Sequence, residues 1–268
     1  MTVSIHPTAL VDKKAELDSD VTVGPYSVIS GRVKIGRGST IASFVRIHDY
    51  VQAGEDCIFH ENSIIGGDPQ DHDYKGEETW VILGNRNIIR ENVTINRSTG
   101  EGSATVVGDN CFIMEGVHIA HNVTVGNNVI MSNKTGLAGH CSIGDNTVLG
   151  GISGVHQFVK VGRFCMIGGL SKVVKDIPPF LLVDGHPGRI YGTNSIGLRR
   201  AGFTPEERSR IKKIYQKIFH SGKTFRIALD ECRQEWSEDH LAREILDFIK
   251  DSNRGIEKWP YTKKERQQ

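Results

Sequence analysis

The chain has 268 residues, which is enough for one large domain and a small second one. Its formal net charge of +1 excludes a uniformly basic surface of the kind that binds nucleic acid. No apolar run approaches the roughly 18 residues that span a bilayer, and the first residues lack the basic-then-apolar pattern of a secretion signal. We therefore expect a soluble, cytoplasmic protein with no transmembrane segment and no nucleic-acid partner.

An aliphatic residue returns at every sixth position from Ile5 to Val173, with two interruptions. The residue two places earlier is usually small or β-branched, as at Val21, Ser39 and Thr135. Positions i and i−2 of a strand point the same way, so both face inward. Such a short fixed period predicts a solenoid. Three six-residue sides form one coil of a triangular prism, and the coils stack as parallel strands; we expect this all-β body over residues 1–180.

Two polar, glycine-containing segments interrupt the repeat, and we expect them to be loops that leave the prism at a corner. The first covers about residues 66–79 and the second about residues 97–104. A loop inserted into a rigid solenoid usually covers a site or contacts a neighbour.

The repeat ends at the double proline of residues 178–179, which cannot continue β pairing. An extended link is expected over residues 181–203. A small C-terminal α-helical domain is expected over residues 204–268.

Three amphipathic helices are expected in this small domain. Thr204 and Glu207 form a capping-box pattern at the start of the first helix, and apolar residues then recur at helical spacing. Residues 225–236 and 241–249 predict the other two. The polar tail after residue 255 is expected to be loose.

Four of the five cysteines occupy one phase of the repeat, four residues after an inward aliphatic: Cys57, Cys111, Cys141 and Cys165. We interpret them as small buried core residues. An odd count without paired spacing argues against a disulfide framework. The sequence has no C-x-x-C pair, which argues against a zinc ribbon.

Four histidines avoid the inward row and fall near one edge of the prism: His118, His121, His140 and His156. Three interpretations compete. They could be exposed turn residues with no shared role; three of them could bind zinc, as in a hydratase on the same coil; or one could be a general base beside substrate-binding neighbours. We favour the general base, because imidazole accepts a proton near neutral pH.

Residues 160–200 carry an excess of basic side chains: Lys160, Arg163, Lys172, Lys175, Arg189, Arg199 and Arg200. The acidic residues in this stretch are Asp176 and Asp184. Two interpretations stay open. The stretch is either a solvated basic face or a contact surface for an acidic partner or a phosphate-bearing ligand.

Several short motifs occur in a fixed order: PQD in the first loop, then HIAHN, LAGH, VHQF, DIPPF and RRAGF. Together they resemble the UDP-N-acetylglucosamine acyltransferases of lipid A synthesis, over nearly the whole chain. The repeat alone is shared by many sugar acyl- and acetyltransferases, whereas the ordered set of motifs is far more specific. The resemblance implies a left-handed parallel β-helix assembled as a homotrimer, with no cofactor and no metal.

The resemblance also implies a reaction, the first step of lipid A biosynthesis. A 3-hydroxyacyl thioester on acyl carrier protein is the donor, and the 3-OH of UDP-N-acetylglucosamine is the acceptor. His121 matches the family's general base, and the backbone N–H of Gly139 matches its oxyanion donor. No acyl-enzyme is implied. Gly169 matches the position that sets how long an acyl chain the groove admits, and its missing side chain implies a long one.

Further positions match residues that bind the substrate. Gln70 and Asp71 match loop residues that reach it from the neighbouring subunit, and Asn194 and Arg200 match tail residues near the nucleotide. His118, His140, His156 and Gln157 match positions around the sugar and phosphates. We also expect Asp73 and Asn122 to contact the substrate.

Four residues depart from the family pattern: Asn122, Asp73, and in the tail Ile196, which replaces an acidic residue, and Ala201, which stands where a second arginine is common. Asn122 follows the catalytic histidine where the family usually has aspartate; an amide can orient an imidazole but lacks the charge that stabilises imidazolium. We therefore predict a weaker base or a different orienting group. Asp73 stands where a lysine is expected, which leaves open a 3-amino acceptor. The alternatives are an N-acyltransferase on a UDP 3-amino sugar, a coenzyme A-dependent sugar acetyltransferase, a zinc hydratase and a binding module.

Overall fold

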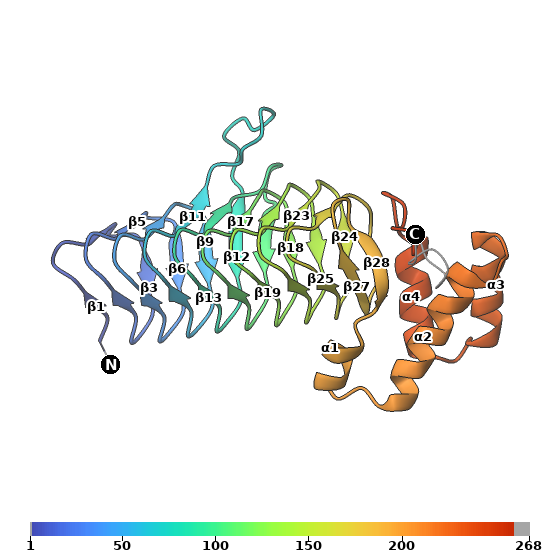
Figure 1. Cartoon of the computed structure of the whole chain (residues 1–268). Coiled ribbons are helices and arrows are strands. Elements are labelled where there is room, and N and C mark those ends of the chain that lie inside the picture. The colour runs from blue at the N-terminus through green and yellow to red at the C-terminus, as the bar shows by residue number, and fades with distance from the viewer. Residues whose placement is uncertain (1, 260–268) are drawn as a thin grey trace.

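The computed structural model describes residues 2–259 and shows a long prism of stacked coils, with the helices beyond one end (Figure 1). Three parallel sheets form its sides. This is the expected left-handed parallel β-helix with a small C-terminal helical part. Residue 1 and residues 260–268, which include most of the tail expected to be loose, lie outside the described residues.

The three sheets are called A, B and C below. Sheet A contains, in spatial order, β1 (Ser4–Ile5), β4 (Thr22–Val23), β7 (Thr40–Ile41), β10 (Ile58–Phe59), β13 (Ile88–Ile89), β16 (Phe112–Ile113), β19 (Ile130–Met131), β22 (Val148–Leu149), β25 (Met166–Ile167), β27 (Leu181–Asp184) and β28 (Arg189–Thr193). Sheet B contains β2 (Leu10–Val11), β5 (Val28–Ile29), β8 (Arg46–Ile47), β11 (Ile64–Gly67), β14 (Thr94–Asn96), β17 (His118–Ile119), β20 (Gly136–Leu137), β23 (Gly154–Val155) and β26 (Lys172–Val173). Sheet C contains β3 (Glu16–Leu17), β6 (Val33–Ile35), β9 (Val51–Ala53), β12 (Trp80–Leu83), β15 (Ala104–Val107), β18 (Thr124–Val125), β21 (Ser142–Ile143) and β24 (Lys160–Val161).

The inward row fills the prism. Ile41, Ile95 and Ile119 are fully buried, because each coil covers the side chains of the next. Ile5 is 45% exposed, since the first coil has no neighbour on its outer side. The four cysteines of the repeat are free and buried, which confirms their assignment to the core.

The corners of the prism turn through residues with positive φ. Asn122 (φ 59°) and His140 (φ 60°) do so at the corner between sheets B and C. Asparagine and histidine are among the non-glycine residues that adopt this left-handed conformation most readily. Side chains at the corner therefore point outward, and the histidines of the sequence motifs lie outside the core.

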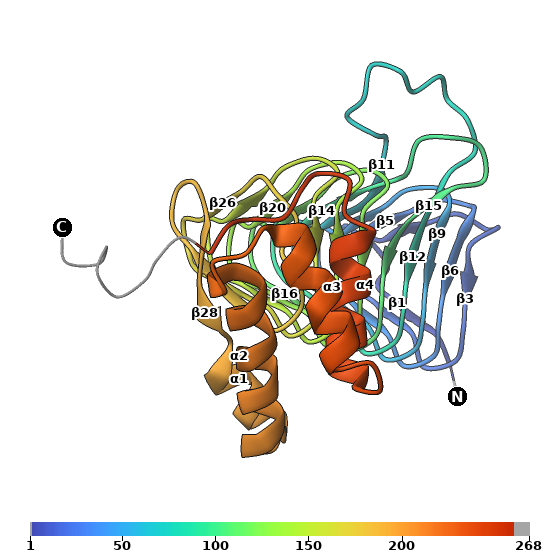
Figure 2. The same ribbon diagram turned by 90° about the vertical axis from the view of Figure 1, so that its right-hand side faces the viewer.

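The first loop projects from the prism between β11 and β12 (Figures 1 and 2). It is anchored by Arg97, which is 8% exposed. The Arg97 guanidinium pairs with Asp68 and donates to the Tyr74 hydroxyl at 3.0 Å. Asn96 donates from Nδ2 to the carbonyl oxygen of Asp68 at 2.8 Å. The base of the loop is thus fixed against the coil that carries the second loop.

Residues 181–203 are extended in the strands β27 and β28, which pair antiparallel. The expectation of an extended link was wrong for residues 195–200, which form a short helix, α1 (Ser195–Arg200). The helix forms because the Asn194 side chain accepts from the Gly197 N–H and Leu198 is buried.

The remaining helices are α2 (Pro205–His220), α3 (Phe225–Glu235) and α4 (His240–Lys250). Thr204 and Glu207 form the expected capping box of α2. The three helices lie across the end of the prism (Figures 1 and 2), where the buried Tyr215 hydroxyl donates to the Pro179 carbonyl at 2.7 Å. None of the described helices is long and apolar enough to cross a membrane.

Candidate active site

A groove of about 560 Å³ lies on the outer side of sheet B, near its corner with sheet C. It brings together six residues expected from the sequence: Gln70, His118, His121, Gly139, His156 and Gln157. The rest of its lining consists of Ala120, Gly136, Leu137, Ala138, Gly154, Val155 and Lys172. Residues from successive coils and from the first loop therefore form one cleft.

His121 is the most enclosed histidine of the groove, with 6% of its surface exposed. Its Nδ1 lies 2.8 Å from Asn122 Oδ1, and its Nε2 lies 3.7 Å from Asp71 Oδ2. The ring packs edge-on against His140, with 5.3 Å between centroids. One ring nitrogen is thus held by the protein, while the other faces the groove and the first loop.

The two histidines nearest to His121, His118 and His140, favour the neutral form of the imidazole. Burial, and then the neighbouring His121, lower the pKa of His118; its Nδ1 lies 2.7 Å from Thr94 Oγ1. The same two causes lower the pKa of His140, with a smaller opposing effect of Asp71, and its ring stacks on Phe158 at 4.8 Å. Neutral imidazoles can hydrogen-bond to a polar ligand without adding charge to the groove.

Gly139 packs directly against the ring of His121. A Cβ on Gly139 would lie 2.5 Å from both Cε1 and Nε2 of that ring. Within residues 2–259 the Gly139 N–H donates to no protein group. A free backbone donor therefore lies beside the imidazole.

Two glycines form the floor of the groove. One register position of sheet B is occupied on four successive coils by His118, Gly136, Gly154 and Lys172. A Cβ on Gly136 or Gly154 would meet nothing within 4 Å, so the absence of side chains opens the groove. Lys172 was not singled out for the site, although its outward position next to the inward Val173 could have indicated it.

The first loop contributes two of the expected residues to the site. Within the chain, Gln70 lines the groove, and Asp71 Oδ2 lies 3.7 Å from His121 Nε2. The anchoring of the loop base by Arg97 folds it over the next coils of the same chain. Asp73 is exposed, and its backbone N–H donates to Asp71 at 3.0 Å. The structure thus does not bring Asp73 to the groove lining.

Three other expected residues lie away from this groove. Asn194 caps α1 and donates to the Phe164 carbonyl at 2.9 Å, at the corner between sheets C and A. Arg200 is exposed at the end of α1. Gly169 lies at the corner between sheets A and B, beside Gly151 of the preceding coil.

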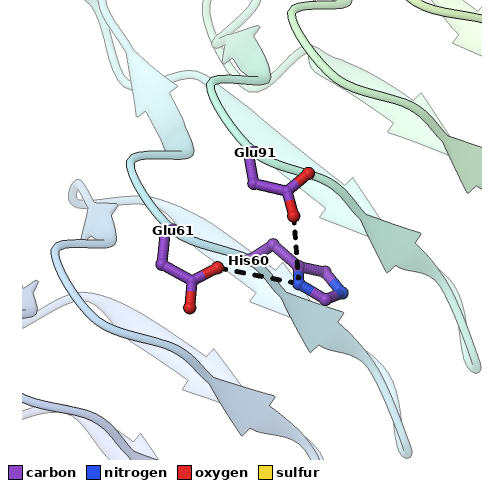
Figure 3. Close-up of side chains that lie close together, drawn as sticks. All are labelled: His60, Glu61 and Glu91. Atoms are coloured by element: carbon purple, nitrogen blue, oxygen red, sulfur yellow. Dashed lines mark ion pairs between the residues drawn. The ribbon is translucent and has the colours of Figure 1, made fainter.

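The histidine band does not converge as metal ligands do. Within residues 2–259, one group of three ligand residues has its donor atoms within 4.8 Å of one another: His60, Glu61 and Glu91 (Figure 3). It lies at the corner between sheets A and B, and Glu91 already accepts two hydrogen bonds of 2.9 Å from Arg90. These contacts describe an ion-pair cluster on the surface, and the groove histidines do not meet the distance that three zinc ligands need.

A cysteine nucleophile is also not favoured. Cys141 follows His140 but points inward, where its Sγ lies 3.1 Å from the His156 carbonyl. Burial raises the pKa of Cys141 to about 11. The thiolate, which is the nucleophilic form, is therefore scarce at neutral pH.

The sequence matches two family models. Residues 14–49 and 104–139 match the bacterial transferase hexapeptide, and residues 176–257 match domain 2 of UDP-N-acetylglucosamine O-acyltransferase. The fold and the groove thus define a hexapeptide-repeat transferase.

Relatives of known identity match almost end to end. The acyl-[acyl-carrier-protein]–UDP-N-acetylglucosamine O-acyltransferase of Thermodesulfovibrio yellowstonii is 43% identical, over 94% of this chain and 98% of the relative. The enzyme of the same name from Chlamydia pneumoniae is 46% identical, over 95% and 92%. The chain belongs to the UDP-N-acetylglucosamine O-acyltransferase family.

Solved structures of UDP-N-acetylglucosamine acyltransferases superpose on nearly the whole of this fold. The UDP-N-acetylglucosamine acyltransferase of Francisella novicida superposes with a TM-score of 0.91 at 36% identity, covering 96% of this chain and 94% of that one. The Arabidopsis enzyme gives a TM-score of 0.86 at 34% identity, covering 95% and 100%.

Proposed function

We propose that this enzyme transfers a 3-hydroxyacyl group from acyl carrier protein to the 3-OH of UDP-N-acetylglucosamine. The observation that carries the proposal is the arrangement of His121, whose Nδ1 is held by Asn122 while Nε2 faces the groove. The names of relatives above 40% identity support the substrates.

His121 is the general base in this mechanism. Its Nε2 takes the proton of the sugar hydroxyl as that oxygen attacks the thioester carbonyl. The new C–O bond forms, the C–S bond breaks, and the proton passes from His121 to the departing sulfur. Direct transfer without an acyl-enzyme fits the inward position of Cys141.

The Gly139 N–H is placed to stabilise the oxyanion that forms during the attack. It is free of protein acceptors within residues 2–259 and lies beside His121. A preorganised donor of this kind contributes roughly 3–4 kcal/mol to transition-state stabilisation.

The acceptor and the acyl chain share the groove. Gln70, His118, His156 and Gln157 offer hydrogen-bonding groups for the sugar, and Lys172 offers a positive charge for the pyrophosphate. The floor of Gly136 and Gly154 leaves an open path across sheet B toward the corner that carries Gly169.

We infer a homotrimer from the outer side of sheet A. An apolar row runs along it in register: Ile58, Ile88, Phe112, Ile130, Val148 and Met166. Ile58 is 37% and Ile130 is 36% exposed, and such a row is buried when a neighbouring copy covers it. In this assembly Asn194 and Arg200 act on the groove of a neighbouring subunit, and the free cysteines fit the reducing cytoplasm.

One experiment tests this function. The purified protein is incubated with UDP-N-acetylglucosamine and a mixture of acyl carrier proteins bearing chains of different length, with acyl-coenzyme A and a UDP 3-amino sugar in parallel, and the products are identified by mass spectrometry. The expected product is a 3-O-acylated sugar nucleotide formed from the carrier-protein donor. His121→Gln is expected to lower kcat by about 10²–10⁴; an unchanged kcat in this variant would sink the proposal.

A further inference from the structure

The second loop contacts Asn122 through both sides of its amide group. Asn122 Oδ1 accepts from the Thr99 N–H at 3.0 Å and from the Thr99 hydroxyl at 2.9 Å. Asn122 Nδ2 donates to the Thr99 carbonyl at 2.9 Å. The backbone N–H of Asn122 also donates to the buried Thr105 hydroxyl at 3.0 Å. A single residue of the loop therefore meets all the polar atoms of the Asn122 side chain.

These contacts determine which way the amide points. A backbone N–H can only donate, and a backbone carbonyl can only accept. If the Asn122 amide were rotated by 180°, its NH₂ would face the Thr99 N–H and its oxygen would face the Thr99 carbonyl. Both contacts would then be repulsive, so the Asn122 oxygen must face Thr99 N and His121.

The orientation of the amide in turn determines the tautomer of His121. Its Nδ1 lies 2.8 Å from Asn122 Oδ1, which can only accept. In the neutral ring, Nδ1 therefore carries the proton and Nε2 keeps the free lone pair. The opposite amide orientation would hold the proton on Nε2, and a catalytic histidine in the wrong tautomer loses about 10⁴ in kcat.

We propose that Thr99 is a positioning residue that orients the Asn122 amide and thereby keeps His121 in the tautomer that can act as a base at Nε2. The inference rests on the proposed function for its kinetic consequence but not for the tautomer itself. The inference also assigns a role to the second loop, because an asparagine can select the histidine tautomer only when its amide group is held in one orientation.

The surrounding groups hold Thr99 in place. The Thr99 carbonyl also accepts from the Ser103 hydroxyl at 2.6 Å. The next residue, Gly100, donates from its N–H to Glu77 Oε1 of the first loop at 2.9 Å. The two loops thus meet at the segment that orients Asn122.

The first test is the nitrogen NMR spectrum of the imidazoles in the full-length protein without substrate. The His121 signals are assigned by their loss in His121→Gln. Above neutral pH the expected spectrum is that of a ring protonated at Nδ1. A ring protonated at Nε2 overturns the inference, and it does so whether or not the enzyme has the proposed activity.

The second test compares Thr99→Val with Thr99→Ser. Valine keeps the shape and the two backbone contacts that orient the amide but removes the hydroxyl donor that strengthens their hold on Asn122 Oδ1. The amide should therefore keep its orientation but be held less firmly, and kcat is expected to fall about three- to tenfold with KM unchanged, as for the loss of one hydrogen bond. Serine keeps the donor and is expected to retain wild-type kcat. If valine and serine have equal kcat, or if valine changes only KM or thermal stability, the Thr99 side chain does not help to position Asn122 and this part of the inference fails.

The third test uses Asn122→Asp and Asn122→Gly, both of which tolerate the positive φ of this corner. Glycine removes the acceptor, and kcat should fall at least tenfold. Aspartate places a negative charge at Nδ1, which favours imidazolium, so the acid limb of the pH–rate profile should move to higher pH. The charged or titratable groups around the ring (Asp71, His118 and His140) stay the same in both variants. An acid limb that does not move in Asn122→Asp would contradict contact between the two side chains.

Discussion

Gly139 lies so close to His121 that a Cβ on Gly139 would be 2.5 Å from the Nε2 atom of that ring. The contact joins two successive coils at the corner between sheets B and C. It leaves the imidazole no room to move toward the backbone, and it places the Gly139 N–H beside the reacting nitrogen. A glycine at this position is therefore required by the base, not by its own backbone angles, because its φ is not positive.

Gly139→Ala tests this contact. The added methyl must displace the His121 ring, since the distance is shorter than real Cβ contacts allow. We expect kcat to fall by about 10²-fold, similar to the loss of general base catalysis, with an unchanged circular dichroism spectrum. A wild-type kcat in this variant would contradict the geometry.

The glycine floor of the groove can be filled without disturbing the fold. A Cβ on Gly154 meets nothing within 4 Å, so Gly154→Val should keep the wild-type melting temperature while transfer of long acyl chains falls at least tenfold. Thr124→Val is the matched control, because Thr124 occupies the same outward position on sheet C. Equal loss of activity in both variants would show that the effect does not come from the groove.

Gly169→Met should change chain selectivity. The residue lies at the far end of the proposed path, where a Cβ would be 3.3 Å from the Gly151 carbonyl oxygen. A longer side chain must therefore project outward into the space that the acyl chain is proposed to use. We expect the preference to shift to shorter acyl donors in competition assays; unchanged selectivity would refute the assignment.

The fold was predictable because its cause is local and repeated. An inward aliphatic at every sixth residue determines the register of each coil, and this register gathers His118, His121 and His156 in one groove. The short helix α1 within the link was not predicted, because six residues are too few to show a helical repeat of apolar residues. Its N-cap, Asn194, had been interpreted as a residue near the nucleotide. The orientation of Asn122 could not be predicted, because it depends on Thr99, a residue of the second inserted loop, whose conformation the repeat does not determine.

Arg97 should control the first loop. Its guanidinium holds Asp68 and Tyr74 at the loop base, and the loop brings Gln70 and Asp71 to the groove. Arg97→Met keeps much of the buried stem but removes both contacts, and hydrogen bonds to charged groups contribute about 1.5–3 kcal/mol. Because Asp68 is largely exposed, we expect the lower end of this range and a rise of about tenfold in KM for the sugar nucleotide.

Limited proteolysis and the KM for the sugar nucleotide check the Arg97 prediction. Limited proteolysis should cut residues 68–79 faster in Arg97→Met than in the wild type. Asp68→Asn is the matched milder variant, since it keeps one acceptor for Arg97. A loop that resists proteolysis equally in all three proteins, with unchanged KM, would show that Arg97 does not hold it.

The lowered pKa of His118 predicts how stability depends on pH. Burial is the main cause, followed by the neighbouring His121. In the unfolded chain the imidazole has a pKa of about 6.5, so between this value and the lower folded pKa the unfolded state binds more protons. Stability is therefore fully present above pH ~6.5 and falls as the pH decreases through this window.

The measurement is the melting temperature between pH 8 and pH 5 for the wild type, His118→Gln and His6→Gln. Glutamine cannot be protonated here, so His118→Gln should show a smaller fall in melting temperature toward pH 5. His6→Gln removes an exposed histidine far from the groove and should follow the wild-type curve. His140, whose pKa is lowered by the same causes, keeps part of the pH dependence in the His118 variant. If His118→Gln lost as much stability on acidification as the wild type, protonation of this buried imidazole would not oppose folding.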